Sequence, residues 1–172
     1  ILHLKFWDKA FALLKARQAI EFVTEGENKG CWVMRLEDEA DREKVIVRSD
    51  GTVTYVGKDI AYQLWKFGLL DRDFYYEPFE REGDKTIWIT TSTPNQNAVS
   101  FGRASKVYNV IDTRQSYLQK IVVQGLKSLN YLAQAEKSIH FSYEMVALSP
   151  QSLKELAYDV REEDKERSFL EV

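Results

Sequence analysis

The sequence predicts an α/β fold from a strand–helix–strand run in its last third, a hairpin signal before its middle, and helical apolar spacing elsewhere. Residues 107–111 are typical of a buried strand, residues 118–129 of an amphipathic helix, and residues 139–146 of a second strand. A crossover of this length joins parallel strands, so a βαβ unit is expected. Ligands bind beyond the carboxyl ends of strands in such sheets, which places residues 112–115 and 143–145 at the expected ligand edge.

The elements before this unit are predicted from local patterns. Residues 2–17 have apolar side chains at helical spacing and predict a helix. Residues 31–36 predict a strand, and the charged run 37–44 predicts a solvated connection. The pair Asp50-Gly51 lies between two β-branched runs and predicts a hairpin.

The middle of the chain combines one short helix with less regular sequence. Asp59 near its start and Gly68 after its end predict the bounds of the helix. Residues 71–85 predict a loop with at most one strand, residues 86–91 a strand, and residues 92–97 a turn-rich loop.

Composition narrows the class of protein. The chain has 172 residues and a net charge of −3, which favours one domain and argues against a broad nucleic-acid-binding face. Its one cysteine, Cys31, excludes an internal disulfide framework and favours a cytoplasmic location. No apolar window is long enough for a membrane span, and cysteine and histidine are too few for a structural zinc site. Because the chain starts at Ile1 and stops in an apolar run, we interpret both ends as cuts through a longer protein.

Three groups of polar residues are candidates for chemistry. If Tyr55 ends a strand and Asp59 opens a helix, a phenol and a carboxylate converge on one pocket, where a carboxylate pairs well with a guanidinium. The simpler interpretation of these two residues is an aspartate that opens a helix beside a tyrosine with a buried ring. In residues 112–115, Gln115 has a donor and an acceptor that can orient an amino acid, but it is equally explained as solvated beside a helix cap. His140 in an apolar strand is more typical of a satisfied core residue than of a catalyst.

The known phosphate-binding and metal-binding motifs are absent from the sequence. It has neither a Gly-x-x-x-x-Gly-Lys loop nor a Gly-x-Gly-x-x-Gly loop, and no histidine–carboxylate set at metal-ligand spacing. The acidic cluster at residues 37–41 lacks the pattern of a calcium loop and is interpreted as a solvated turn. We therefore predict no metal site.

Three segments in order nevertheless resemble arginyl-tRNA synthetase, a class I aminoacyl-tRNA synthetase. Residues 48–61, Arg-Ser-Asp-Gly-Thr-Val-Thr-Tyr-Val-Gly-Lys-Asp-Ile-Ala, resemble the family's Arg-Ser-Asp-Gly-Thr-x-Thr-Tyr segment and its continuation to Asp-Ile-Ala. Residues 107–119 resemble a later strand and helix, and residues 140–148 the approach to the second class I signature. The resemblance implies the second half of a Rossmann-like nucleotide-binding fold with a mostly parallel sheet, a β-hairpin and flanking helices.

The resemblance also implies ligands and residue roles. Tyr55 and Asp59 correspond to the residues that hold the substrate guanidinium, and Gln115 to the glutamine that orients bound arginine. His140, Tyr143, Met145 and Val146 correspond to the region near the adenine of ATP. L-arginine, ATP with Mg²⁺, and tRNA(Arg), the last mainly through other parts, are the implied partners of the parent enzyme. No tightly bound cofactor and no membrane is implied.

The sequence departs from the family at several points. It has neither the His-Ile-Gly-His-type nor the Lys-Met-Ser-Lys-Ser-type signature, whose charges stabilise the transition state, so the segment alone is expected to be inactive. Glu144 stands where many relatives have glycine, and residues 71–105 are longer than the usual connection. We expect one catalytic-domain segment over 1–172: residues 1–106 before the βαβ unit, 107–148 for the unit, and 149–172 toward the missing signature. The alternative is a non-catalytic synthetase-like module that binds arginine or a protein partner.

Overall fold

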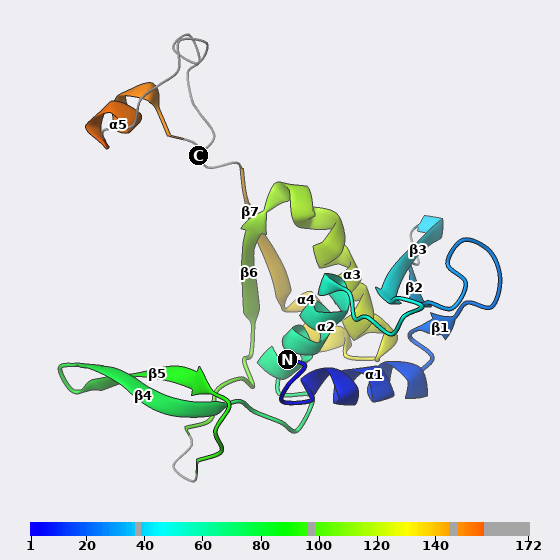
Figure 1. The fold of residues 1–172 in the computed structure, drawn as a ribbon, viewed down its shortest axis with the longest axis horizontal. Coiled ribbons are helices and arrows are strands. Elements are labelled where there is room, and N and C mark those ends of the chain that lie inside the picture. The colour runs from blue at the N-terminus through cyan, green and yellow to red at the C-terminus, as the bar shows by residue number, and fades with distance from the viewer. Residues whose placement is uncertain (37–38, 96–98, 145–147, 157–172) are drawn as a thin grey trace.

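Figure 1 shows the computed structural model, which describes residues 1–36, 39–95, 99–144 and 148–156. The helices and strands in chain order are α1 (Phe6–Ala16), β1 (Glu21–Phe22), β2 (Trp32–Leu36), β3 (Glu39–Val47), α2 (Tyr55–Lys66), β4 (Tyr75–Glu82), β5 (Lys85–Thr91), β6 (Val107–Asp112), a 3-10 turn (Thr113–Gln115), α3 (Ser116–Ser128), α4 (Leu132–Glu136), β7 (Ser138–Tyr143) and α5 (Pro150–Glu155). The strands form the antiparallel sheet β1-β2-β3, the antiparallel hairpin β4-β5 and the parallel pair β6-β7. The α/β class is confirmed. A mostly parallel sheet is not, because β6-β7 is the one parallel pair among the described strands.

The predicted βαβ unit is present. β6 and β7 are in register from Val107 opposite Ser138 to Asp112 opposite Tyr143, with α3 and α4 between them in the chain. α3 lies beside this pair in Figure 1. The expectation of a buried strand holds for one face of β6, where Val107 and Asn109 are buried, but not for the other, where Tyr108 and Val110 are 58% and 62% exposed. The end of the second predicted strand, residues 145–146, lies outside the described residues.

In the N-terminal half, the structure corrects two of the predicted segments. α1 begins at Phe6 rather than at residue 2, because Lys5 at φ 57° is in the left-handed conformation and interrupts the helix. The charged run 37–44 is not a solvated connection from residue 39 onward: β3 begins there and pairs with β2. The charges made this run resemble a loop, but the backbone groups of β2 on this side pair with β3.

The predicted hairpin at Asp50-Gly51 forms as a turn but has little second strand. Arg48 N donates to Thr52 O at 2.9 Å, and Thr52 N donates to the Asp50 carboxylate at 2.8 Å. Beyond the turn, pairing is limited to a bridge between Val47 and Val53. The chain leaves the sheet there because α2 begins two residues later.

The one strand that the sequence allows within residues 71–85 is present as β4, which takes up most of the segment and pairs with β5 around the turn Gly83-Asp84. In Figure 1 this hairpin projects away from the helices. The carboxylate of Asp73 stabilises the base of the β4-β5 hairpin. One of its oxygens accepts from Trp65 Nε1, Phe74 N and Tyr76 Oη at 2.7–2.9 Å. The other accepts from Ser100 Oγ and Phe101 N at 2.9 and 3.0 Å. A single side chain thus connects α2, β4 and the segment that follows residue 99.

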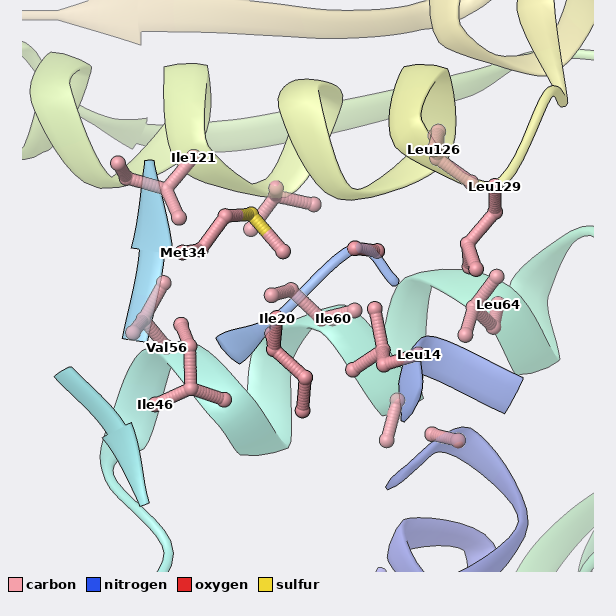
Figure 2. Close-up of a cluster of buried hydrophobic side chains, with 14 of the residues drawn as sticks. Leu14, Ile20, Met34, Ile46, Val56, Ile60, Leu64, Ile121, Leu126 and Leu129 are labelled. Atoms are coloured by element: carbon pink, nitrogen blue, oxygen red, sulfur yellow. The ribbon is translucent and has the colours of Figure 1, made fainter. Parts of the chain in front are cut away.

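The core is built around α2, which packs on α1, α3 and β3. Figure 2 shows the apolar face of α2 directed at that of α3, with Met34 of β2 beside Ile121. Ile60, Leu64 and Ile121 are at most 1% exposed. Burying such side chains contributes about 1.5–3 kcal/mol each, so α2 is held firmly on its apolar side while its other face stays available.

Gly57 in the first turn of α2 is required by a close approach. A Cβ atom there would lie 3.0 Å from both Ile46 O and Val53 Cγ1. We expect Gly57→Ala to lower the free energy of unfolding by about 1–2 kcal/mol, because overpacking outweighs the gain in helix propensity. The matched control is Gly125→Ala in α3, where the nearest atoms are Ile60 side-chain atoms at 3.4–3.5 Å and no loss is expected. Urea unfolding of both variants checks this, and equal midpoints would contradict it.

Candidate functional site

The first turn of α2 is positioned by Thr54. Its hydroxyl accepts from Gly57 N at 3.4 Å and donates to Ile46 O at 3.0 Å, so it caps the helix and ties it to β3. Tyr55 is therefore the first residue of the helix rather than the end of a strand, and Asp59 lies in the second turn rather than at the opening. This corrects the expected local structure. The two residues are four apart on one helix, so both side chains lie on the same face.

Tyr55 is almost entirely in solvent, with 82% of its surface exposed. The expectation of a buried ring is wrong. Lys58 Nζ lies 5.2 Å from the centroid of the ring. The ring also borders an open hollow of about 550 Å³ lined by residues of β3, the turn after it, α2 and α3, among them the cations Lys44 and Arg48. An exposed phenol at the rim of a hollow is available to a ligand.

Asp59 reaches solvent, yet the protein around it raises the pKa of its carboxyl, and the cation Lys66 acts in the opposite direction. A raised pKa means that the charged form has lost part of its hydration. Such a carboxylate is poised to accept hydrogen bonds from an incoming cation, since part of the cost of removing water has already been met by the fold.

Lys66 lies two turns after Asp59 on the same side of α2. Its Nζ donates to Asn109 Oδ1 of β6 at 2.8 Å and lies 4.7 Å from the centroid of the Tyr62 ring. Burial lowers the pKa of Lys66, while Asp59 raises it. Sequence reasoning missed this residue, although its position seven residues after Asp59 already placed it on the same side of a helix.

Gln115 is exposed at the junction between the 3-10 turn and α3. Asp112 caps the turn by accepting from Arg114 N at 2.7 Å and also binds the Arg114 guanidinium, which lowers the pKa of Asp112. The expected cap is therefore present at Asp112, but it caps the 3-10 turn and not α3, whose N-cap residue Gln115 makes no side-chain cap hydrogen bond. Within the described part of the chain, no hydrogen bond or ion pair joins Gln115 to Tyr55 or Asp59, and neither Gln115 nor Asp59 lines the hollow beside Tyr55.

The candidate adenine region is described only in part. His140 Nε2 donates to Ile111 O at 2.9 Å, so its ring links β7 to β6, although the residue is half-buried and not part of the core. Tyr143 is 43% exposed at the end of β7. Met145 and Val146 lie outside the described residues. The carboxyl ends of β6 and β7 therefore carry exposed polar and aromatic groups on the same edge.

The described residues contain neither a metal-binding cluster nor a membrane-spanning helix. No group of three or more histidine, cysteine, aspartate or glutamate side chains is arranged to hold a metal ion. None of the helices in the ranges that the structure describes has the length and apolar character needed to cross a bilayer.

Several known proteins similar in sequence to this chain are arginine–tRNA ligases. The arginine–tRNA ligase of Thermococcus kodakarensis is 38% identical over 142 residues, which cover 80% of this chain and 22% of the relative. That of Thermus thermophilus is 37% identical over 161 residues, or 90% of this chain and 26% of the relative. The solved structure of Thermus thermophilus arginyl-tRNA synthetase matches with a TM-score of 0.71 and 33% identity over 83% of this chain and 24% of that one.

This chain is homologous to a segment of the arginine–tRNA ligases. The resemblance predicted from residues 48–61, 107–119 and 140–148 is confirmed. The chain spans between 22% and 26% of the length of these relatives, and no family model matches it. Arginine–tRNA ligases are aminoacyl-tRNA synthetases, so this is the enzyme class to which the segment is related.

Proposed function

We propose that this chain supplies the arginine-binding part of the catalytic domain of an arginine–tRNA ligase, with Tyr55, Asp59 and Gln115 as the residues that hold L-arginine. The observation that carries the proposal is the exposed face of α2, where the side chains of Tyr55 and Asp59 lie one turn apart. Homology to the ligases over most of the chain supports the same assignment.

The chemistry of Asp59 suits a guanidinium better than an ammonium. Two carboxylate oxygens accept two parallel N–H groups from a planar guanidinium, whereas a lysine ammonium offers no such fork. The Tyr55 ring presents a face or a hydroxyl beside it. Selectivity for arginine would then come from polar groups that any other amino acid leaves unpaired.

Gln115 would orient the polar backbone groups of the substrate, because its amide has both a donor and an acceptor. We expect Gln115→Ala in the full-length protein to raise the KM for arginine about five- to tenfold, which is the loss of one or two neutral hydrogen bonds. Steady-state pyrophosphate exchange measures it. The control Gln134→Ala on α4 should keep both Michaelis constants. A Gln115→Ala enzyme with an unchanged KM for arginine would remove this residue from the site.

The proposed reaction joins arginine to ATP and then to tRNA(Arg). The α-carboxylate of arginine attacks the α-phosphorus, the bond to the pyrophosphate oxygen breaks, and arginyl-adenylate and pyrophosphate result. A carboxylate is already a nucleophile, so this segment needs no general base and contributes by positioning. The arginyl group then passes to the 3′ end of the tRNA.

ATP, with Mg²⁺ as its accompanying cation, is the proposed second substrate. We place its adenine near His140, Tyr143, Met145 and Val146, beyond the end of β7, in keeping with ligand binding at the carboxyl ends of parallel strands. tRNA would contact mainly other parts of the enzyme, because a net charge of −3 offers little attraction for phosphates. The single cysteine favours a cytoplasmic location.

We further propose that the parallel pair belongs to the second half of a Rossmann-like sheet. Four large side chains on one face of β6-β7 are 43–62% exposed, namely Tyr108, Val110, Phe141 and Tyr143. Parallel sheets are normally covered on both faces. An uncovered apolar face supports a place for this pair within a larger sheet, with residues 1–106 and 149–172 flanking residues 107–148 in one catalytic domain.

The test is arginine-dependent ATP–pyrophosphate exchange by the full-length protein. The proposal expects exchange with L-arginine and none with L-lysine, together with arginyl-tRNA formation when tRNA(Arg) is added. Binding of arginine without any exchange would instead favour the non-catalytic module, and exchange that another amino acid supports equally well would overturn the assignment of substrate.

A further inference from the structure

We infer that Lys66 is a positioning residue for the arginine site, because its hydrogen bond to Asn109 fixes the helix carrying Tyr55 and Asp59 against the strand that leads to Gln115. This inference rests on the function proposed above. It assigns a role to a residue that does not itself contact the substrate.

The contact has the geometry of a specific bond. Lys66 Nζ lies 2.8 Å from Asn109 Oδ1, and the ammonium also lies 4.7 Å from the centroid of the Tyr62 ring. Asn109 is only 7% exposed. A charged donor that is partly buried needs a partner, and a buried amide needs one as well, so neither side can be removed without leaving the other unsatisfied.

The connection joins the two separate parts of the site. Tyr55 and Asp59 lie on α2, whereas Gln115 follows β6 after the turn at residues 113–115. Apolar packing holds α2 firmly against α3, but the hydrophobic effect is not directional. A directional bond between α2 and β6 selects one position along the strand, and with it one distance between the helix residues and Gln115.

A second hydrogen bond also fixes the carboxyl-terminal half of α2 against the parallel pair. Gln63 Nε2 donates to Ser138 Oγ at 2.9 Å, and both side chains are buried, at 2% and 8% exposure. Ser138 is the first residue of β7 and lies opposite Val107 of β6. The carboxyl-terminal half of α2 is therefore bonded to both strands of the parallel pair, while its amino-terminal half carries the candidate ligand residues.

Loss of the Lys66 charge and loss of its hydrogen bond are expected to change the KM for arginine in opposite directions. The two effects can therefore be distinguished by experiment. Lys66 is the cation that acts on Asp59, so a purely electrostatic effect would weaken the hold on a guanidinium, and removing the charge would lower the KM for arginine. Loss of positioning would raise it, because small displacements of ligand groups cost up to about 100-fold.

The test uses Lys66→Met, Lys66→Arg and Asn109→Ser in the full-length enzyme, with pyrophosphate exchange and thermal unfolding measured for each. We expect Lys66→Met and Asn109→Ser to raise the KM for arginine about tenfold while the KM for ATP changes less than twofold. Lys66→Arg, which keeps a cationic donor, should restore most of the loss. The matched control is Lys127→Met, an exposed lysine at the end of α3, which should change neither constant.

The outcomes distinguish this inference from the proposed function. Asn109→Ser keeps the Lys66 charge and a small polar group, so it remains informative if Lys66→Met does not fold. If Asp59→Asn raises the KM for arginine but Lys66→Met and Asn109→Ser leave it within twofold, or lower it, the inference about Lys66 is wrong. Equal increases in the KM values for arginine and ATP would indicate general damage and would also overturn it. If Asp59→Asn itself has no effect, the proposed function fails.

Discussion

Replacing Asp59 by asparagine is expected to raise the KM for arginine about 100-fold or more in pyrophosphate exchange by the full-length enzyme. The substitution keeps the size of the side chain but exchanges one acceptor oxygen for an NH₂ group that points donors at the donors of the guanidinium. Truncating one side of a hydrogen-bonded charge pair typically costs about 2–5 kcal/mol. The KM for ATP should change little, because Asp59 lies on α2 and the proposed adenine region lies beyond β7.

The control for this variant is Asp71→Asn, which makes the same chemical change in an exposed residue just past α2. Asp71 has a φ of 46°, a conformation that asparagine tolerates well, so the fold should be undisturbed. Asp59 also gives a pH dependence: protonation removes its charge, so kcat/KM for arginine should fall as the pH approaches its raised pKa from above. Asp59→Asn should lose that acid limb. A KM within twofold of the unmodified enzyme would contradict the role of Asp59.

Replacing Asp73 is expected to have the largest effect on stability. Its carboxylate accepts five hydrogen bonds from Trp65, Phe74, Tyr76, Ser100 and Phe101. Asp73→Ala leaves these donors without their partner, and we expect a loss of about 2–4 kcal/mol in the free energy of unfolding. Hydrogen exchange should rise at the Phe74 and Phe101 amides, at the base of the β4-β5 hairpin, and far less in α3.

The pH dependence of Asp73 has a definite sign. Burial raises the pKa of its carboxyl, but the hydrogen bonds from Tyr76, Trp65, Ser100 and Phe74 outweigh burial and leave it below the ordinary value of 3.8. A carboxyl with a lowered pKa in the folded state stabilises the fold above its unfolded pKa, and that contribution is lost as the pH falls through the folded value. The stability difference between the unmodified protein and Asp73→Ala should therefore shrink below about pH 4. A difference that stays constant down to the lowest pH would mean that Asp73 acts only by filling space.

The sequence-based prediction succeeded where patterns are local and failed where partners are distant. The β6-α3-β7 unit was predictable because each element shows its own periodicity. Residues 39–44 were predicted as a loop because they are charged, but the strand partner that orders them, β2, is visible only in the fold. The strand within residues 71–85 was allowed for, but its position and length were not predicted, because β4 depends on its pairing with β5.

In the candidate site too, local features were predictable from the sequence and distant contacts were not. The common helix face of Tyr55 and Asp59 follows from a spacing of four once the helix is known to begin at Tyr55. Its start was placed too late because aspartate is a common helix opener, while Thr54 is the residue whose hydroxyl reaches Gly57 N. The bond from Lys66 to Asn109 joins residues far apart in the chain, so no local pattern could have indicated it.

The most direct test of the arginine site compares L-arginine with L-citrulline, its neutral analogue of nearly the same shape, as substrates for pyrophosphate exchange. Citrulline presents a carbonyl oxygen where arginine presents N–H groups, so a carboxylate at position 59 repels it and an asparagine amide can donate to it. We predict that the unmodified enzyme prefers arginine by a factor of about 1,000 or more in kcat/KM, and that Asp59→Asn reduces this preference at least 100-fold. An unchanged preference in Asp59→Asn, with Asp71→Asn as the control, would show that the guanidinium is bound elsewhere and would contradict the proposed function of this chain.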